Sequence, residues 1–287
     1  MADTLPNRVV HIRSRDCDFI DGVYTIGLKE PIFCLPTEEI IIELAFASVP
    51  YSFFNVEADY NNKLDIIESE LDGSNPVSTT ITLDIGNYNA LQLLTNLQAN
   101  LNANTAKGFT YLITYNKNTN QATFSTTSPN AKCQFLFQTG PNIDLDCMEL
   151  LGFTLGDYSF DTNTTLTSNG TMNVSPYDAV YIRSGSFGIT NNYETKNKGI
   201  SDILAKIPIN TVPFGFITWT NDMRLSYIST KQVIEFMEIR ITDLDGNFLN
   251  LRGNPWTMSV VFGIRKRPGP VFQPLRPNQD LPIQIED

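Results

Sequence analysis

The sequence predicts a mainly β fold, a β-sandwich into which an α+β segment is inserted. Extended segments rich in β-branched and aromatic residues open the chain, with no helical period between them, at residues 9–16, 23–28, 40–51 and 54–56. A second block contains two long segments with apolar residues at every second position, 237–241 and 256–264. A helical pattern occurs between the two blocks, so we expect the two blocks together to form the sandwich.

Length and charge limit the possible functions. The 287 residues fit one large domain or two small ones and can bury a substantial core. The formal net charge of -11 argues against direct contact with nucleic acid, because neutralising phosphates requires clustered Lys and Arg. No apolar run approaches the ~20 residues that span a bilayer, and residues 1–4 lack a signal-peptide layout, so we expect synthesis inside the cell and no transmembrane segment.

The four cysteines predict free thiols. They lie far apart, without a Cys-x-x-Cys pair or a nearby histidine, so neither a zinc site nor a redox dithiol is expected. We expect mostly buried side chains at Cys17, Cys34, Cys133 and Cys147.

The segment near residue 40 predicts a strand in the middle of a sheet. Ile40, Ile42, Leu44 and Phe46 form one apolar face, and the opposite face is also largely apolar. Pro50 ends the regular ladder because it has no N–H to donate.

Residues 76–155 predict an α+β unit. A strand at 80–85 is followed by Asn-rich residues 86–89, which offer a helix cap. Ala90, Leu94, Leu97 and Leu101 then recur at helical spacing, and Gly108 supplies a stop. Short strands are expected at 110–115, 122–124 and 135–137, joined in part by a hairpin turn over 116–120.

Residues 156–176 are rich in Asp, Asn, Thr, Ser and Gly, which predicts a flexible surface loop. Three Asn-x-Ser/Thr triplets begin there, and we interpret them as loop composition rather than glycan sites. They start at Asn163, Asn169 and Asn173. Beyond residue 267, prolines at 268, 270, 274, 277 and 282 predict an extended arm that cannot join a central strand.

The order of these pieces carries a family resemblance. It consists of an arm ending near Asp16, a strand ending at Leu28, an apolar strand entering Val49-Pro50-Tyr51, an Asn61-Asn62 turn, Gly86-Asn87-Tyr88 before the Leu-rich helix, and Leu151-Gly152-Phe153. This order resembles the penton (vertex, minor capsid) proteins of virophages, polinton-like viruses and related tailless icosahedral dsDNA viruses. The turns before Trp256 extend the resemblance to both ends of the chain.

The resemblance implies a single jelly roll and a homopentamer at each fivefold vertex, made in the host cell interior and located in the virion. It also implies contact with neighbouring capsomers of a double jelly-roll major capsid protein. This chain is too short to hold two jelly rolls itself. We expect an N-terminal arm (1–18), a jelly-roll sandwich (19–75 plus 177–266), an α+β insertion (76–155), a flexible loop (156–176) and a Pro-rich C-terminal arm (267–287).

We expect no catalytic, cofactor-binding or metal-binding residues, and hence no enzyme. The one histidine, His11, lies in the predicted arm, which is a poor place for a triad, and no Gly-rich phosphate loop occurs. Asp243-Leu244-Asp245-Gly246 predicts a hairpin turn, because the later ligands of a calcium loop are missing. The carboxylate clusters Glu38-Glu39 and Glu68-Ser69-Glu70 would serve a glycosidase only across a sugar-binding cleft.

The basic triplet 265–267 predicts a solvated strand end, with nuclear import, phosphate binding or docking on an acidic capsid neighbour as alternatives. Two function classes remain. The first is a structural capsid protein. The alternative is a viral spike or a receptor- or carbohydrate-binding β-sandwich module, in which the insertion would carry the site. A pentameric mass supports the first class and a trimeric mass the second.

Overall fold

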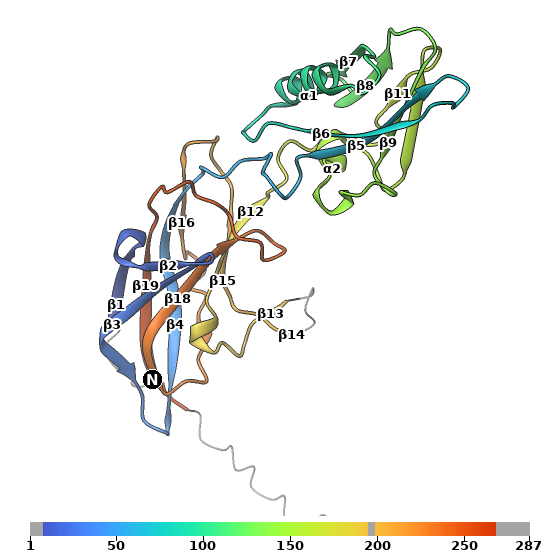
Figure 1. Cartoon of the computed structure of the whole chain (residues 1–287). Coiled ribbons are helices and arrows are strands. Elements are labelled where there is room, and N and C mark those ends of the chain that lie inside the picture. The colour runs from blue at the N-terminus through green and yellow to red at the C-terminus, as the bar shows by residue number, and fades with distance from the viewer. Residues whose placement is uncertain (1–7, 195–198, 268–287) are drawn as a thin grey trace, which may run out of the picture.

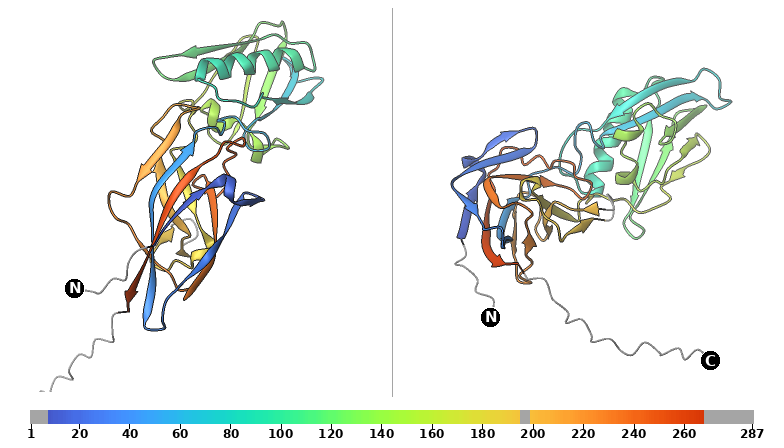
Figure 2. Two further views of the ribbon diagram at one scale, coloured as in Figure 1. Left: turned by 90° about the vertical axis from the view of Figure 1, so that its left-hand side faces the viewer. Right: turned by 90° about the horizontal axis from the view of Figure 1, so that it is seen from below.

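The protein consists of a β-sandwich and a smaller α+β lobe placed end to end, as the computed structural model shows for residues 8–194 and 199–267 (Figure 1). Two further views show the same separation (Figure 2). The strands of the sandwich are β1 (Arg8–Arg13), β2 (Asp18–Ile20), β3 (Val23–Phe33), β4 (Glu38–Pro50), β12 (Ala179–Arg183), β15 (Ile203–Pro208), β16 (Phe216–Thr220), β17 (Tyr227–Ile228), β18 (Val233–Thr242) and β19 (Thr257–Lys266).

The α+β lobe lies between β4 and β12 in the chain. Its elements are β5 (Lys63–Glu70), β6 (Val77–Thr82), α1 (Ala90–Asn104), β7 (Tyr111–Asn116), β8 (Gln121–Thr126), β9 (Ala131–Leu136), α2 (Met148–Leu151), β10 (Asp157–Asp161) and β11 (Leu166–Thr167). A small hairpin of β13 (Tyr193–Glu194) and β14 (Gly199–Ile200), and the 3-10 turns Ser14–Asp16, Ile143–Leu145 and Gly185–Phe187, complete the described elements.

The sandwich is made of two five-stranded sheets. The first has the order β1-β19-β4-β16, with β17 also paired to β4, and the second has the order β15-β12-β18-β3-β2. All pairings in both sheets are antiparallel. Two stacked sheets bury the side chains between them, which explains the continuous core of the sandwich.

The strand pairing is that of a jelly roll. The first strand, β1, pairs with the last described strand, β19, and the long strand β3 pairs with the strand before it, β18. β4, which follows β3, pairs with β16 and β17, and the innermost pair is β12 with β15. These nested pairs alternate between the two sheets, as expected when a long antiparallel hairpin is wrapped into a sandwich. The predicted mainly β fold with a single jelly roll is confirmed.

The two lobes have separate hydrophobic cores. The first part of the sandwich core ends at Phe53, and its second part begins at Val180 and includes Trp256. The lobe core begins at Val56 and includes Phe135. The boundary therefore falls within the short connector after β4.

The predicted division between sandwich and insertion is corrected at β5. This strand lies in the predicted sandwich segment 19–75, yet it pairs with β6 and β9 in the lobe. Its residues Leu64 and Ile66 are fully buried in the lobe core. The segment was placed in the sandwich with the rest of residues 19–75, because the local pattern of one segment carries no information about which sheet it joins.

The predicted N-terminal arm is also corrected. Residues 8–13 form β1, which pairs with β19 from Arg8↔Phe262 to Arg13↔Thr257, and Ile12 is only 1% exposed. The charged residues Arg13, Arg15 and Asp16 suggested an arm, but Arg13 is an exposed residue at the end of a paired strand. Residues 1–7 and most of the predicted C-terminal arm, 268–287, lie outside the described residues.

The predicted flexible loop 156–176 instead completes the lobe. β10 pairs with β9 and β11 with β8, while Phe160 and Met172 are buried in the lobe core. The polar composition that suggested a loop belongs to the turns, where side chains bond to nearby backbone groups, as Thr164 does to Asp161 N–H.

A β-bulge in β4 changes which side chains face the core. The register with β19 shifts between Ser259↔Phe46 and Val260↔Leu44, so Ala45 is an extra residue. The alternation reverses there, as expected at a bulge. Phe46, predicted on the buried face, is therefore only half-buried, and Ala47 is fully buried instead.

The predicted helix is confirmed as α1. Asn89 caps it, since its side chain accepts a hydrogen bond from Gln92 N–H at 2.9 Å while the Gln92 side chain accepts one from Asn89 N–H at 3.0 Å. The leucines at positions 94, 97 and 101 face the lobe core as expected. The cap fixes the start of the helix next to the connector between the lobes.

Candidate functional site

The residues that the sequence analysis considered for chemistry and then set aside lie in separate parts of the structure. His11 lies exposed on β1, with Nδ1 2.8 Å from Ser259 Oγ. Within residues 8–194 and 199–267, no three His, Cys, Asp or Glu side chains are arranged to hold a metal ion. None of the helices in these ranges is long and apolar enough to cross a membrane.

The two carboxylate clusters bind groups of the protein itself. Glu38 accepts a hydrogen bond from Leu35 N–H at 2.9 Å, and Glu39 pairs with Arg265. Glu68, fully buried, accepts hydrogen bonds from Tyr111 OH at 2.5 Å, Thr105 Oγ1 at 2.6 Å and Lys107 N–H at 2.9 Å. Burial raises the pKa of Tyr111, which keeps its hydroxyl protonated as a donor. Glu68 thus anchors the chain just after helix α1.

The basic triplet ties β19 to β4. Besides the Arg265–Glu39 ion pair, Arg267 donates from Nε to Glu38 O at 3.0 Å and from its backbone N–H to Thr37 O at 2.9 Å. Two of the three basic side chains are therefore engaged at a strand end. The prediction was a solvated strand end, and docking of this triplet on an acidic neighbour stays the alternative.

The predicted turn at Asp243 is confirmed. Its carboxylate accepts hydrogen bonds from Asn247 N–H at 2.8 Å and Asn247 Nδ2 at 2.9 Å, and Gly246 takes a positive φ of 89°. Both carboxylate oxygens are used within the turn.

The four cysteines are free, as predicted. Cys34, Cys133 and Cys147 are buried, and Cys17 is partly exposed. Burial raises the pKa of Cys133 to about 12, so this thiol stays protonated and unreactive at neutral pH.

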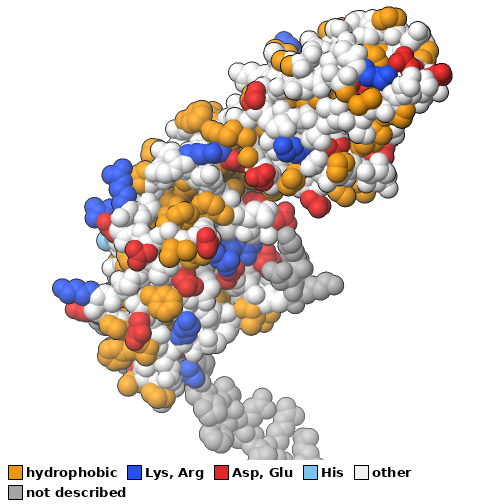
Figure 3. All heavy atoms as spheres, viewed as in Figure 1, with side chains coloured by type: hydrophobic (Ala, Val, Ile, Leu, Met, Phe, Trp, Pro, Cys, Tyr) orange, Lys and Arg blue, Asp and Glu red, His pale blue; other side chains and the backbone are white. Residues whose placement is uncertain are grey.

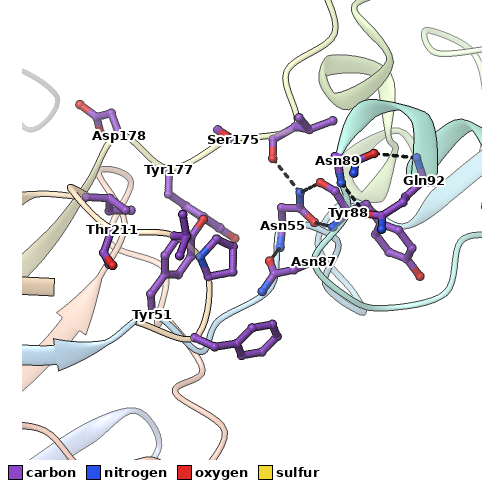
Figure 4. A pocket seen from close by; sticks show the side chains of 15 residues that line it. Tyr51, Asn55, Asn87, Tyr88, Asn89, Gln92, Ser175, Tyr177, Asp178 and Thr211 are labelled. Atoms are coloured by element: carbon purple, nitrogen blue, oxygen red, sulfur yellow. Dashed lines mark hydrogen bonds between the residues drawn. The ribbon is translucent and has the colours of Figure 1, made fainter. Parts of the chain in front are cut away.

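A cavity of about 770 Å³ lies at the joint between the two lobes. Side chains from both sides line it, as Figure 4 shows. The sandwich contributes Tyr51, Tyr177 and the loop before β16, and the lobe contributes the start of helix α1. Aromatic rings and amides are suited to bind polar ligands such as sugars.

Most amides at this cavity are already hydrogen-bonded within the protein. Asn55, 5% exposed, donates from Nδ2 to Tyr88 O at 2.7 Å and to Val174 O at 2.6 Å, and its Oδ1 accepts from Tyr88 N–H at 2.9 Å. Its backbone N–H donates to Asn87 Oδ1 at 3.0 Å (Figure 4). One side chain therefore joins the two connectors to the segment before helix α1, and the joint is a built structural element.

Aromatic residues reinforce the joint on the sandwich side. Phe53 packs edge-on against Tyr177 at 5.3 Å between ring centroids and contacts Tyr51 at 4.6 Å. Arg252 pairs with Glu57 at 2.5 Å, and its guanidinium lies over the Phe54 ring. These contacts link the connector after β4 to the loop before β19.

An acidic cavity of about 330 Å³ lies on another side of the joint. Its lining includes Asp144, Asp146 and Glu149 from the lobe and Asp245 from the sandwich. Figure 3 shows acidic side chains gathered where the two lobes meet. Burial, followed by the neighbouring acidic groups, raises the pKa of Asp146 to about 6.

Sequence reasoning missed Asn55. The partners of its side chain lie 33 and 119 residues away in the chain, so no local pattern marks it. Asn55 was placed in the predicted extended segment 54–56, and only Asn61-Asn62 was interpreted as a turn.

Comparisons with known proteins give a structural match and no sequence match. No family model matches the chain, and no curated protein sequence matches it significantly. The penton protein of mavirus matches 90% of this chain and 99% of its own chain, with 9% identity and a TM-score of 0.49. The flagellar cap protein FliD of Escherichia coli (domains D2–D3) matches 88% of this chain and 98% of its own, with 9% identity and a TM-score of 0.16. TM-scores below 0.5 do not establish a common fold, so the jelly-roll assignment rests on the strand pairing.

Proposed function

We propose that this chain is a structural viral capsid protein, a penton that forms the pentameric capsomer at icosahedral fivefold vertices. The observation that carries the proposal is the nested pairing of the sandwich, from β1 with β19 inward to β12 with β15. Jelly rolls of this kind build viral capsids, although lectin domains and cupins share them. The order of sequence pieces that resembles penton proteins favours the capsid among these classes.

The arrangement of the lobes supports a ring of subunits. The α+β lobe extends from one end of the sandwich and leaves both long flanks exposed (Figures 1 and 2). One flank is bounded by β1 and β2 and the other by β15 and β16. A cyclic oligomer needs such a pair of different flanks, because each subunit's flank meets the opposite flank of the next.

The proposal includes the location and the partners. As a penton, the chain would be part of the virion at the capsid vertex, in contact with capsomers of the major capsid protein. The net charge of -11 supports a position away from direct contact with the packaged genome.

The spike or carbohydrate-binding alternative depends on the cavity between the lobes. Its polar lining is largely committed to internal hydrogen bonds, as the Asn55 contacts show. A sugar would have to displace these bonds or bind the remaining hydroxyls, so the cavity gives this alternative no specific support.

A reconstruction of the intact particle tests the proposal. We expect this chain as a pentamer around each fivefold axis, and density for it away from every such axis would overturn the assignment. The mass of the assembled protein in solution is a second measurement, in which a trimer would favour the spike.

A further inference from the structure

Among the edge strands that the structure describes in the sandwich, β16 is the least protected. Free strand edges pair readily with other chains, and proteins usually protect them with charge, proline or short length. Among the described edges, β1 carries Arg8 and Arg13, β2 has only three residues, and β15 contains Lys206 and ends at Pro208. β16, with the sequence FITWT, has neither charge nor proline.

The outer backbone groups of β16 are free to pair. Tyr51 N–H donates to Gly215 O at 2.9 Å, and Asn221 N–H donates to Ala45 O at 3.1 Å, so the backbone N–H and C=O groups of the odd-numbered residues face β4. In an antiparallel ladder the backbone groups of the even-numbered residues then point away from β4. These residues are Phe216, Thr218 and Thr220, which are exposed and have no other backbone partner in the described part of the chain.

Exposed apolar side chains continue this edge. Val212 is 75% exposed, Phe214 74%, Phe216 60% and Met223 81%. We call these four residues and β16 the edge strip. Large apolar side chains this exposed and this close in the chain indicate an interaction surface.

Phe214 shows that the edge strip is not optimised for the isolated subunit. Its φ of 70° lies in the left-handed region, which costs a bulky residue about 1–2 kcal/mol. It sits in a bulge, since Phe214 N–H donates to Tyr51 O at 2.7 Å and Gly215 O accepts from Tyr51 N–H. Glycine or asparagine would suit this position better. An aromatic side chain that is both strained and exposed points to contact with a partner.

We propose that the edge strip binds the C-terminal segment 281–285 of a second copy of this chain, which adds to β16 as a strand. The sequence continues from 268 to 287, and Leu281, Ile283 and Ile285 alternate there with Pro282 and Gln284. In a strand, these three apolar residues share one face and point their backbone groups to one side. They match the three outward residues of β16, and the N–H that Pro282 lacks would face solvent.

The length of the remaining chain permits this contact. Arg267 is bound at the start of β4, whereas β16 pairs with the other end of β4, at Phe46–Pro50. The 13 residues from 268 to 280 can span at most about 45 Å, enough to cross to an adjacent subunit. Binding to a second copy rather than to the same chain rests on the proposed function, because a ring requires each subunit to bind the next.

Disulfide trapping in the full chain tests the pairing. Thr218→Cys and Ile283→Cys are placed in separate copies, each with Cys17→Ser so that only buried native thiols remain, and the two proteins are mixed and oxidised. Opposite residues in a hydrogen-bonded pair are about 5.5 Å apart between Cα atoms, which suits a disulfide. We expect a covalent dimer. Phe216→Cys and Thr220→Cys should likewise form a covalent dimer with Leu281→Cys or Ile285→Cys, the odd-numbered positions beside Ile283. Gln284→Cys, whose side chain points to the opposite face, is the matched control.

Two results would overturn the proposal. One is trapping of Ile283→Cys no stronger than that of Gln284→Cys at all three β16 positions. The other is an internal disulfide in the double variant Thr218→Cys/Ile283→Cys at high dilution when the mixed single variants give none, which would mean that each tail binds its own chain.

A second variant separates partner binding from subunit stability. Phe214→Asn should leave the melting temperature unchanged or raise it, because asparagine tolerates a positive φ, and should weaken self-association at least tenfold. Lower stability with unchanged self-association would show that Phe214 serves the subunit instead. If the cysteine variants form pentamers but no cross-link, this inference alone is contradicted. If they form the cross-link but no pentamers, the proposed function alone is contradicted.

Discussion

The sandwich and the α+β lobe differ in how far apart in the chain their paired strands lie. In the sandwich, β1 pairs with β19, and His11 contacts a residue 248 positions later. In the lobe, every strand pairs with one that lies between residues 63 and 167. The lobe is one continuous segment, whereas the sandwich is split around it.

This difference bears on folding. Closing a long loop costs entropy before its contacts form, so distant pairings form slowly. The lobe can form from its own segment, and its formation brings the two halves of the sandwich together at the connectors near Phe53 and Tyr177, whose rings are in contact. We propose that the lobe is an independently stable unit and that the sandwich depends on both chain ends.

Removing β19 should have the largest effect on this comparison. A chain ending before Thr257 loses the strand that joins β1 to β4, so we expect the sandwich to unfold and the lobe to remain folded. Hydrogen exchange measures this as lost protection in β3 and β4 with retained protection in α1. Truncation after Arg267 is the control and should leave the thermal midpoint nearly unchanged. Loss of protection in α1 as well would show that the lobe is not independent.

Core truncations should affect one lobe each. Trp256 and Phe135 are both fully buried, one in each core. We expect each change to alanine to cost about 3–5 kcal/mol of unfolding free energy in its own lobe. Hydrogen exchange of amides in β18 and β9 reports the two lobes separately. Equal losses in both lobes from either variant would mean that the two cores unfold as one unit.

Asn55→Ala should weaken the joint. The change leaves Tyr88 N–H, Tyr88 O and Val174 O without their side-chain partner, and we expect a cost of about 2–3 kcal/mol. Calorimetry should show the transitions of the two lobes moving apart, because the link between them is loosened. Asn118→Ala, in the exposed β7–β8 turn, is the matched control. A variant that melts as the wild type does would show that the connectors hold without Asn55.

Asp146→Asn should have the smallest effect. The pKa of Asp146 in the folded protein, about 6, lies above the ordinary value of 3.8, so the folded state binds the proton more tightly. The stability of the lobe therefore falls as pH rises from about 4 to 6. Asparagine keeps the acceptor for Met148 N–H, so the variant should gain under about 1 kcal/mol at pH 7, a small value because the group is half-exposed. Urea unfolding of both proteins at pH 4 and pH 7 measures this. An equal difference at both pH values would rule out the carboxylate charge as the cause.

The sequence by itself determined the main helix and several of the long strands. Leucine spacing and the asparagine before Ala90 predicted α1 and its cap, and the alternation of apolar residues predicted β18 and β19. These features are local, since the period of an element and its capping residue are set by neighbours within a few positions.

Only the tertiary structure decided which strands pair and which side chains meet. β1 and β5 were assigned to the wrong units, because their sheets are fixed by partners far along the chain. The bulge in β4 reversed its buried face at Ala45, and the role of Asn55 appeared only when two connectors came together. The physical reason is that a strand's pattern determines how much of each face is buried, whereas the neighbour that buries it depends on the packing of the whole chain.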